Sequence, residues 1–385
     1  MNDPAPATRP QHLNPPEHIL VDPEVVNSSL SRRVLSRMPG VPWTVCRNYQ
    51  KQLQDLGTDS QVLYLKNYKG RFLRPCPGTS RYHCCGYQII HIGENCPLQC
   101  TYCILQAYFQ DRVLKIWANQ QDLFQELEEH LTRSDTPIRA GTGEFTDSLA
   151  LEAVTGFTGD LVSFLGDYHN ICLELKSKIV ELGWMHKVKH PDRVLPAWSV
   201  NSQALISAQE KDTDSLEQRM QAARACVQQG FRICLHFDPI IHYPGWQKGY
   251  ARAVETIFDY VRPRDIAYMS LGSFRFMPDL EKIIMRNHPR ADYVYNEFIT
   301  GLDGKKRLLL PLRLEQFRFI IGRLKESGMG HNMYLCMESG AVWKKVLGYT
   351  PKELGGLDKH LLRLSFPTRS QNSPKIFIDR HKLLS

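Results

Sequence analysis

The sequence predicts an α/β fold: an open, partial (β/α)6 barrel of the TIM type, with an N-terminal cap and a C-terminal hairpin and helical extension. Between residues 86 and 285, short apolar segments alternate with stretches of helical periodicity, which is typical of a parallel sheet. The segments are almost continuously apolar, as parallel strands buried on both faces are. They number six, too few for a closed eight-stranded barrel: 86–93, 137–143, 171–176, 194–200, 231–238 and 265–271.

The stretches between these segments have the spacing of amphipathic helices. Asn119 is placed to cap a helix whose apolar stripe runs from Leu123 to Leu131. Another helix is expected from about Ser215, and Gly230 is placed to end it. Each helix returns the chain to the start of the next strand, as an open barrel requires.

The pattern changes after the last predicted strand. The turn Gly301-Leu302-Asp303-Gly304 lies between the extended stretches 293–298 and 307–312, which predicts a hairpin. Helical and strand patterns follow it, whereas the proline-rich, polar N-terminus is expected to be disordered. The predicted divisions are 1–18 (disordered tail), 19–85 (N-terminal cap), 86–285 (barrel), 286–365 (C-terminal hairpin and helical extension) and 366–385 (polar tail).

The composition is that of a globular protein, with 42% apolar and 23% charged residues in a chain of 385. No stretch approaches the length of a membrane span and no apolar signal segment is present, so we expect a cytoplasmic protein without membrane association. Eleven cysteines in that setting suggest metal or redox ligands rather than disulfides. The net charge of +8 is compatible with a nucleic-acid partner, although most basic residues are spread out, as on a solvated surface.

Three cysteines in the run ENCPLQCTYCILQAY carry the most specific signal. Cys96, Cys100 and Cys103 have the spacing C-x3-C-x2-C directly after the first apolar segment, so one tight loop can direct three thiolates at one centre. A [4Fe–4S] cluster is normally held by four thiolates, so three leave one iron open for a further ligand. The alternative is structural zinc, which needs four ligands, commonly in paired C-x2-4-C units, and the sequence has no second pair.

Polar residues also follow the next predicted strands, where parallel-sheet enzymes bind their ligands. The glycines among them let the backbone come close to a ligand. The acidic residue could bind a ligand's ammonium group, and the lysine could bind a ligand's carboxylate. The hydroxyl and amide side chains could bind a carboxylate and a ribose. A guanidinium near the start of the following helix offers a bidentate carboxylate clamp. Each of these residues could instead have no ligand-binding role and simply belong to a loop, be a surface amine or cap a helix. In strand order these residues are Gly141, Gly143 and Glu144, then Lys178, then Ser199 and Asn201, then Arg219.

The cysteine triplet, with Tyr102 just before its third member, resembles the signature of the radical SAM superfamily. The resemblance implies that the open iron chelates S-adenosylmethionine (SAM) and that the sequence around Glu144 binds the methionine amino group. It further implies reductive cleavage of SAM to a 5′-deoxyadenosyl radical, with an external one-electron reductant of the flavodoxin or ferredoxin type. The implied SAM pocket consists of Tyr102, Gly141, Gly143, Glu144, Lys178, Ser199, Asn201 and Arg219.

Longer stretches resemble the spore photoproduct lyases over roughly residues 19–330. They include CTYCILQ, VLKIWANQQDLF and PIIHYPGWQKGY. The resemblance implies that Lys178 and Ser199 contact the SAM carboxylate and that the basic hairpin Lys305–Arg307 approaches DNA. Radical modification of RNA or of a small metabolite remains an alternative. A non-catalytic iron–sulfur electron carrier is another, although such a protein needs no residues for binding SAM.

Two positions depart from the lyase pattern. Glu144 stands where lyases carry the cysteine that returns a hydrogen atom to the product, and Ile104 replaces a tyrosine that helps this relay. We therefore expect the radical generator without the lyase's own radical return. Cys85 is the candidate replacement donor. Cys76, Cys84 and Cys336 are further candidates. Cys76, Cys84 and Cys85 could alternatively hold an auxiliary cluster, or Cys84 and Cys85 could only open a strand as small apolar residues.

Overall fold

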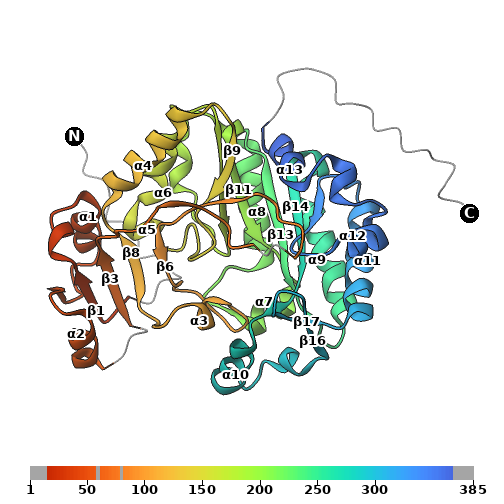
Figure 1. The fold of residues 1–385 in the computed structure, drawn as a ribbon, viewed down its shortest axis with the longest axis horizontal. Coiled ribbons are helices and arrows are strands. Elements are labelled where there is room, and N and C mark those ends of the chain that lie inside the picture. The colour runs from red at the N-terminus through yellow and green to blue at the C-terminus, as the bar shows by residue number, and fades with distance from the viewer. Residues whose placement is uncertain (1–14, 58–60, 79–80, 367–385) are drawn as a thin grey trace, which may run out of the picture.

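The computed structural model describes residues 15–57, 61–78 and 81–366. The predictions for residues 1–14 and 367–385, which make up most of the two expected tails, fall outside this range. Figure 1 shows a small N-terminal sheet at one end of the molecule, helices α11–α13 at the other end, and a curled sheet between them. Within the described residues, no helix has the length and apolar character needed to cross a bilayer.

The curled sheet confirms the predicted open barrel. It has the strand order β18-β14-β13-β11-β10-β9-β5-β4, and every neighbouring pair is parallel except β4 with β5. All six predicted strands are present, as β5 (Gln88–Ile90), β9 (Ile138–Gly141), β10 (Ile171–Ser177), β11 (Val194–Ser199), β13 (Ile233–Ile240) and β14 (Ile266–Ser273). Two short strands widen it beyond the six, one at each edge: β4 (Leu73–Pro75) and β18 (Met333–Leu335).

Helices follow the barrel strands as predicted. Ser215 caps α8 and forms a capping box with Gln218. Asn119 occupies the cap position of α4 but makes no capping bond; its side-chain amide instead exchanges two hydrogen bonds with the backbone of Tyr68, at 2.9 Å each. The barrel helices are α4 (Gln120–Arg133), α5 (Glu152–Thr155), α6 (Phe157–Leu165), α7 (Gln203–Gln209), α8 (Leu216–Gln228), α9 (Trp246–Tyr260) and α10 (Pro278–Asn287).

The N-terminal sheet draws its strands from both sides of the cysteine loop. Its order is β2-β1-β3-β8-β6, and it has its own apolar core, which includes Leu63 and Ile116. Because β6 precedes the cysteines and β8 follows them, the loop leaves and re-enters this sheet. The elements are β1 (His18–Val21), β2 (Trp43–Val45), β3 (Val62–Lys66), β6 (Gly93–Glu94), β8 (Leu114–Trp117), α1 (Ser29–Arg37) and α2 (Tyr49–Leu56).

The C-terminal part contains the expected hairpin in a shorter form. β16 (Phe298–Thr300) and β17 (Lys306–Leu308) pair antiparallel, and β15 (Arg275–Phe276) pairs with β17. The flanks differ from the prediction because Asp292–Tyr295 forms a 3-10 turn and a helix with proline in its first turn begins at Leu310. The remaining helices are α11 (Leu310–Glu326), α12 (Gly340–Leu347) and α13 (Leu357–Ser365).

Candidate functional site

The cysteine loop is anchored at both ends. At its start, Asn95 has a left-handed backbone (φ 67°), and its amide donates hydrogen bonds to the carbonyls of Asp111 and Val113 at 3.1 and 2.8 Å. Further along, β7 (Gln99–Cys100) pairs antiparallel with β12 (Glu210–Lys211). The loop is therefore fixed to the N-terminal sheet on one side and to the segment after α7 on the other.

The three cysteines of the loop are free thiols at one cavity. Cys100 is buried, Cys96 and Cys103 are half-buried, and all three are free thiols. Burial raises the pKa of each thiol, because a buried thiolate lacks solvation. All three line a cavity of about 460 Å³. In the described part of the chain no three His, Cys, Asp or Glu side chains are grouped tightly enough to hold a metal ion, so the cluster ligands stay a prediction.

The glycines after β9 are required by the packing of the chain itself. A Cβ atom on Gly141 would collide with the Tyr87 hydroxyl and the Glu174 carbonyl, and one on Gly143 would lie 2.9 Å from the Lys176 carbonyl. These positions let the strand end approach β10 closely. Glu144, which follows them, pairs with Lys176, with Oε1 2.6 Å from Nζ.

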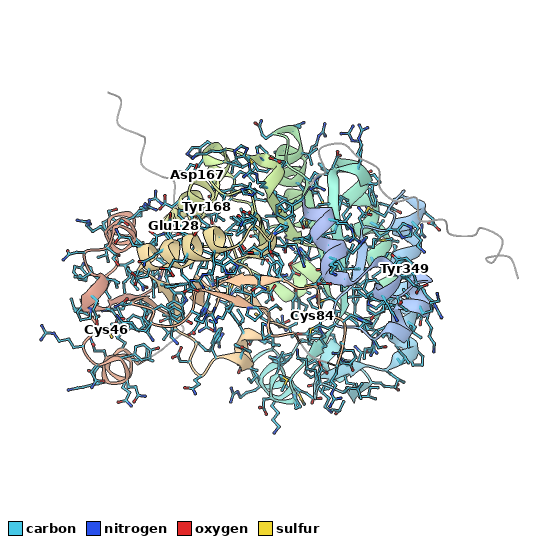
Figure 2. All side chains as sticks on the ribbon, turned by 45° about the horizontal axis from the view of Figure 1, so that its top comes forward. Cys46, Cys84, Glu128, Asp167, Tyr168 and Tyr349 are labelled. Atoms are coloured by element: carbon cyan, nitrogen blue, oxygen red, sulfur yellow. The ribbon has the colours of Figure 1, made fainter. Side chains whose placement is uncertain are left out.

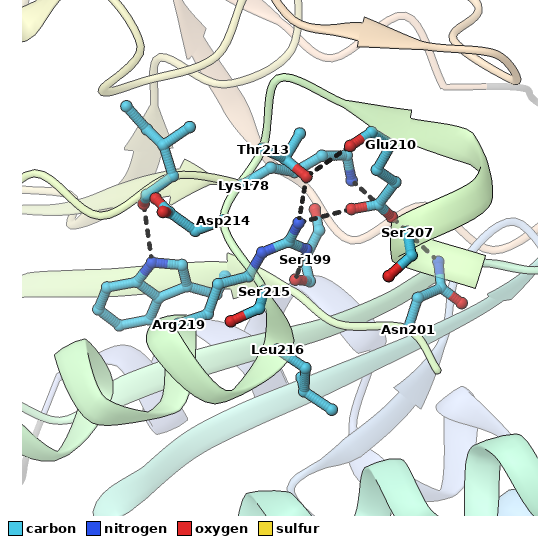
Figure 3. A network of polar contacts seen from close by, with 12 residues as sticks. Lys178, Ser199, Asn201, Ser207, Glu210, Thr213, Asp214, Ser215, Leu216 and Arg219 are labelled. Carbon is cyan, nitrogen blue, oxygen red and sulfur yellow. Dashed lines mark hydrogen bonds and ion pairs between the residues drawn. The ribbon is translucent and has the colours of Figure 1, made fainter. Parts of the chain in front are cut away.

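Lys178 lies directly beside the cysteine loop. Its Nζ stands 5.6 Å from the centre of the Tyr102 ring and 3.9 Å from Glu210 Oε1, and its side chain is 15% exposed. Its backbone N–H donates to Asp147 at 2.9 Å. The amine is thus held next to the loop without being fully enclosed. Figure 3 shows its contact with Glu210.

Glu210, a residue that the sequence did not single out, lies at the centre of this network (Figure 3). Its carboxylate is fully buried and accepts hydrogen bonds from the Tyr102 hydroxyl, from Arg219 Nη2 at 2.6 Å and from Asn201 Nδ2 at 3.4 Å. Burial opposes its ionisation, but Lys178 and Arg219 bring the pKa of Glu210 down to about 2. The surrounding sequence, EKDTD, is a charged run that is typical of a solvated loop, so the sequence does not indicate that Glu210 is buried.

Arg219 and Asn201 are committed to partners inside the protein. Arg219 is fully buried, and besides Glu210 it donates to the Ser199 carbonyl at 2.8 Å and to Thr213 at 2.9 Å. Asn201 accepts from the Tyr250 hydroxyl at 2.7 Å. Both residues therefore shape the strand ends and the position of Glu210, and Lys178 is the cation of the network that a ligand can reach.

Asp147 is a second residue of this region without a predicted role. Its carboxylate accepts from the Ser177 hydroxyl at 2.8 Å and from the backbone N–H groups of Lys178, Leu149 and Ala150 at 2.9, 2.9 and 3.0 Å. It ties the loop after β9 to the end of β10. An aspartate in a turn makes such contacts often, so the sequence alone did not distinguish it.

Comparison with known proteins identifies the family. The spore photoproduct lyase profile matches residues 15–300. This chain belongs to the spore photoproduct lyase family. The curated spore photoproduct lyases of Geobacillus sp. (strain Y412MC61) and Bacillus subtilis (strain 168) are 22% and 21% identical to it over 206 and 213 residues, which cover 52% and 54% of this chain. The matched stretch spans only 60% and 62% of those relatives.

Solved structures of spore photoproduct lyase share the fold. A mutant with bound AdoMet and dinucleoside spore photoproduct superposes with a TM-score of 0.71, covering 83% of this chain and 98% of the other at 16% identity. A complex with the dinucleoside spore photoproduct gives 0.70 at 15% identity, covering 86% and 99%. At such low identity the likeness concerns the fold.

In this member of the spore photoproduct lyase family, several thiols lie along the edge of the barrel formed by β18. The His83 N–H donates to the Glu338 carbonyl at 3.3 Å, so the segment that carries Cys85 runs beside the segment after β18. A hydrogen bond from Cys84, helped by Arg139 and opposed by burial, lowers the pKa of Cys85 to about 6. Cys336 accepts from Arg275 Nη2 at 3.3 Å. Figure 2 places Cys84 near the middle of the molecule, far from Cys46, which directly follows β2.

The basic side chains of the hairpin are only partly exposed to solvent. Arg307 is 2% exposed and is held by Asp303 at 2.8 Å and by the Met337 carbonyl at 3.1 Å. Lys305 is half-buried, and burial together with the neighbouring Arg275 lowers its pKa. The most exposed apolar residue of the turn is Leu302, at 75%. The hairpin therefore presents an apolar tip above a partly covered basic base.

Proposed function

We propose that this chain is a radical SAM enzyme of the spore photoproduct lyase type. In this proposal Cys96, Cys100 and Cys103 hold a [4Fe–4S] cluster, and Lys178 binds the carboxylate of SAM beside it. When bound, the cluster supplies one electron that cleaves SAM and yields a 5′-deoxyadenosyl radical. Family membership supports the chemistry, and the placement of Lys178 next to the cysteine loop is the observation that carries it.

The charges around Glu210 support a carboxylate-containing ligand. Two cations, Lys178 and Arg219, share this single buried carboxylate. Arg219 is closely paired at 2.6 Å and fully buried, whereas Lys178 is 3.9 Å away and 15% exposed. One positive charge is therefore incompletely neutralised, and an ammonium in this position gains from pairing with a ligand carboxylate.

The cysteine loop suits the cluster in number and in chemistry. Three thiols on one loop leave an iron open for SAM, which an electron carrier does not need. Their pKa values are raised by burial, and the positive charge of bound iron stabilises the thiolates that water does not reach. We infer that an external one-electron reductant of the flavodoxin or ferredoxin type reduces the cluster.

DNA is the substrate class that we propose. The relatives are named spore photoproduct lyases, and one related structure contains a dinucleoside spore photoproduct. The hairpin around Lys305 would contact the nucleic acid, and Cys85 would return the hydrogen atom. The ion pair of Glu144 with Lys176, in place of the lyase thiol, favours as second candidate a radical modification of RNA or of a small metabolite that ends without a thiol donor at that position.

The test begins with anaerobically reconstituted protein. Dithionite and SAM are added, and 5′-deoxyadenosine is quantified by mass spectrometry. An enzyme forms it, whereas an electron carrier does not. The same assay with deuterated DNA, RNA or metabolite pools identifies the substrate class, because abstraction moves the label into 5′-deoxyadenosine. The absence of both 5′-deoxyadenosine and iron would contradict the proposed function.

A further inference from the structure

We propose that Glu210 is a positioning residue that couples the cysteine loop to the carboxylate-binding amine of Lys178. This inference rests on the proposed function and names a link within the same site. Its starting point is the backbone: in the antiparallel β7–β12 pair, Glu210 lies directly opposite Cys100. The same pair brings the Thr101 N–H to the Gln209 carbonyl at 2.9 Å. The carboxylate is thus fixed to the loop that would carry the cluster.

The two oxygens of Glu210 have different neighbours. Oε2 accepts from Arg219 at 2.6 Å, which anchors the carboxylate to the barrel. Oε1 accepts from the Tyr102 hydroxyl and, at 3.4 Å, from Asn201 Nδ2, and it faces Lys178 Nζ at 3.9 Å. Oε1 is therefore the oxygen that joins the aromatic residue of the cysteine loop to the amine that would hold the ligand.

Because Tyr102 and Lys178 share one oxygen of Glu210, binding of a ligand at Lys178 and the state of the cysteine loop depend on each other. A ligand carboxylate on Lys178 draws the ammonium away from Oε1 and changes how strongly that oxygen holds Tyr102. Coupling between two binding sites is reciprocal. If a ligand at Lys178 changes the affinity of the cysteine loop for the cluster, the cluster must therefore change the affinity of the Lys178 site for the ligand by the same factor.

A purely structural ion pair is the competing explanation, and the chain contains a matched comparator. Glu174 is also buried, accepts from a tyrosine hydroxyl (Tyr268) and stands 3.7 Å from an arginine (Arg139). Its pKa is likewise about 2, although burial opposes ionisation, because His236 and Arg139 favour the charged form. These partners lie in barrel strands β9, β13 and β14. Glu174→Gln therefore measures what neutralising a buried carboxylate costs the fold.

The experiment compares Glu210→Gln with Glu174→Gln in reconstituted holoprotein. The readouts are melting temperature, SAM dissociation constant, and the SAM-induced changes in the electron paramagnetic resonance spectrum and midpoint potential of the cluster. We expect both variants to melt earlier. Only Glu210→Gln should reduce or abolish the SAM-induced spectral and potential changes, because it removes the oxygen that links Tyr102 to Lys178.

A second variant keeps the test decisive if Glu210→Gln fails to fold. Glu210→Gln with Arg219→Gln removes both buried charges and avoids leaving an unpaired guanidinium. It should recover stability but not the SAM-induced spectral change. If the Glu210 and Glu174 variants show the same SAM-induced spectral change, the inference is overturned while the proposed function stays intact. Wild-type protein that binds no SAM would overturn both.

Discussion

Lys176 Nζ lies 2.6 Å from Glu144 Oε1, so an ion pair occupies the position that the sequence resemblance assigns to the hydrogen-returning thiol of the lyases. Lys176 is largely enclosed, and although burial disfavours its charge, Glu144 raises its pKa above the ordinary value. An ammonium group of SAM that approached Glu144 would compete with this lysine. The pair therefore bears on both predicted roles of Glu144, as a SAM ligand and as a departure from the lyase pattern.

The cluster assignment predicts the effect of removing the cysteines. Anaerobically purified wild-type protein should be brown and contain about four irons per chain. Replacing Cys96, Cys100 and Cys103 together with alanine should abolish the colour and the iron. The matched control replaces Cys76, Cys84 and Cys85 and should keep a full complement. Iron that survives in the first variant and is lost in the second would show that the main site is elsewhere.

The SAM pocket predicts a graded loss of affinity. Lys178→Ala should weaken SAM binding by about 1.5–3 kcal/mol, roughly ten- to hundredfold, because it removes a charge-assisted contact. Ser199→Ala and Glu144→Gln should weaken it as well while leaving the cluster in place. Lys211→Ala is the control, since Lys211 lies on the same short strand as Glu210 and is exposed. Equilibrium titration measures the affinities, and unchanged binding in all three pocket variants would exclude the pocket as drawn.

Acid should destabilise the fold through its depressed carboxyl groups. Glu210 has a pKa of about 2 in the folded protein against an ordinary value of 4.5, as burial is outweighed by Lys178 and Arg219. A depressed pKa contributes stability that is complete above about pH 4.5 and is lost as pH falls toward 2. The free energy of unfolding should fall by up to about 1.4 kcal/mol per pH unit for each such group. Urea unfolding at several acidic pH values should show a shallower dependence in Glu210→Gln, and an identical dependence would contradict the assignment.

Much of this fold could be read from the sequence, and the exceptions have physical reasons. Parallel strands buried on both faces, such as β10, form unbroken apolar runs and were found. β4 and β18 lie in stretches that were expected to be extended, but with three residues each they carry no signal that they join the barrel sheet. The two-sheet anchoring of the cysteine loop depends on β8 pairing with β3, a contact between distant segments.

The site residues also fall into those that the sequence indicates and those that only the structure reveals. The cysteine spacing is local and was visible, as was Lys178 at a strand end. Glu210 was not, because a buried carboxylate in a charged loop is recognised only once its partners, Arg219 and Tyr102, are brought to it. The sequence likewise did not reveal that Arg219 is paired inside the protein rather than offered to a ligand.

The thiols near β18 predict unusual reactivity. The pKa of Cys85 is lowered to about 6 by the hydrogen bond from Cys84 and by Arg139, against the effect of burial. A depressed thiol pKa favours reaction of Cys85 with electrophiles at lower pH than an ordinary thiol. Alkylation followed by peptide mass spectrometry should give a rate for Cys85 that reaches its plateau at lower pH than the rate of an ordinary cysteine. Cys84→Ala should move that plateau to higher pH, and an unchanged profile would remove Cys84 as the cause.

The hydrogen-atom return predicts a specific limit on activity. We expect the protein to cleave SAM but not to convert spore photoproduct to thymine over many turnovers, because a carboxyl O–H bond is too strong to give a hydrogen atom to a carbon radical. Glu144→Cys should raise the yield of thymine from the dinucleotide photoproduct, and adding Ile104→Tyr should raise it further. Glu144→Ser is the matched control, with a hydroxyl of similar size and no donor ability. Efficient multi-turnover repair by the wild-type protein would contradict this expectation, and loss of that repair in Cys85→Ala would then identify Cys85 as the thiol that returns the hydrogen.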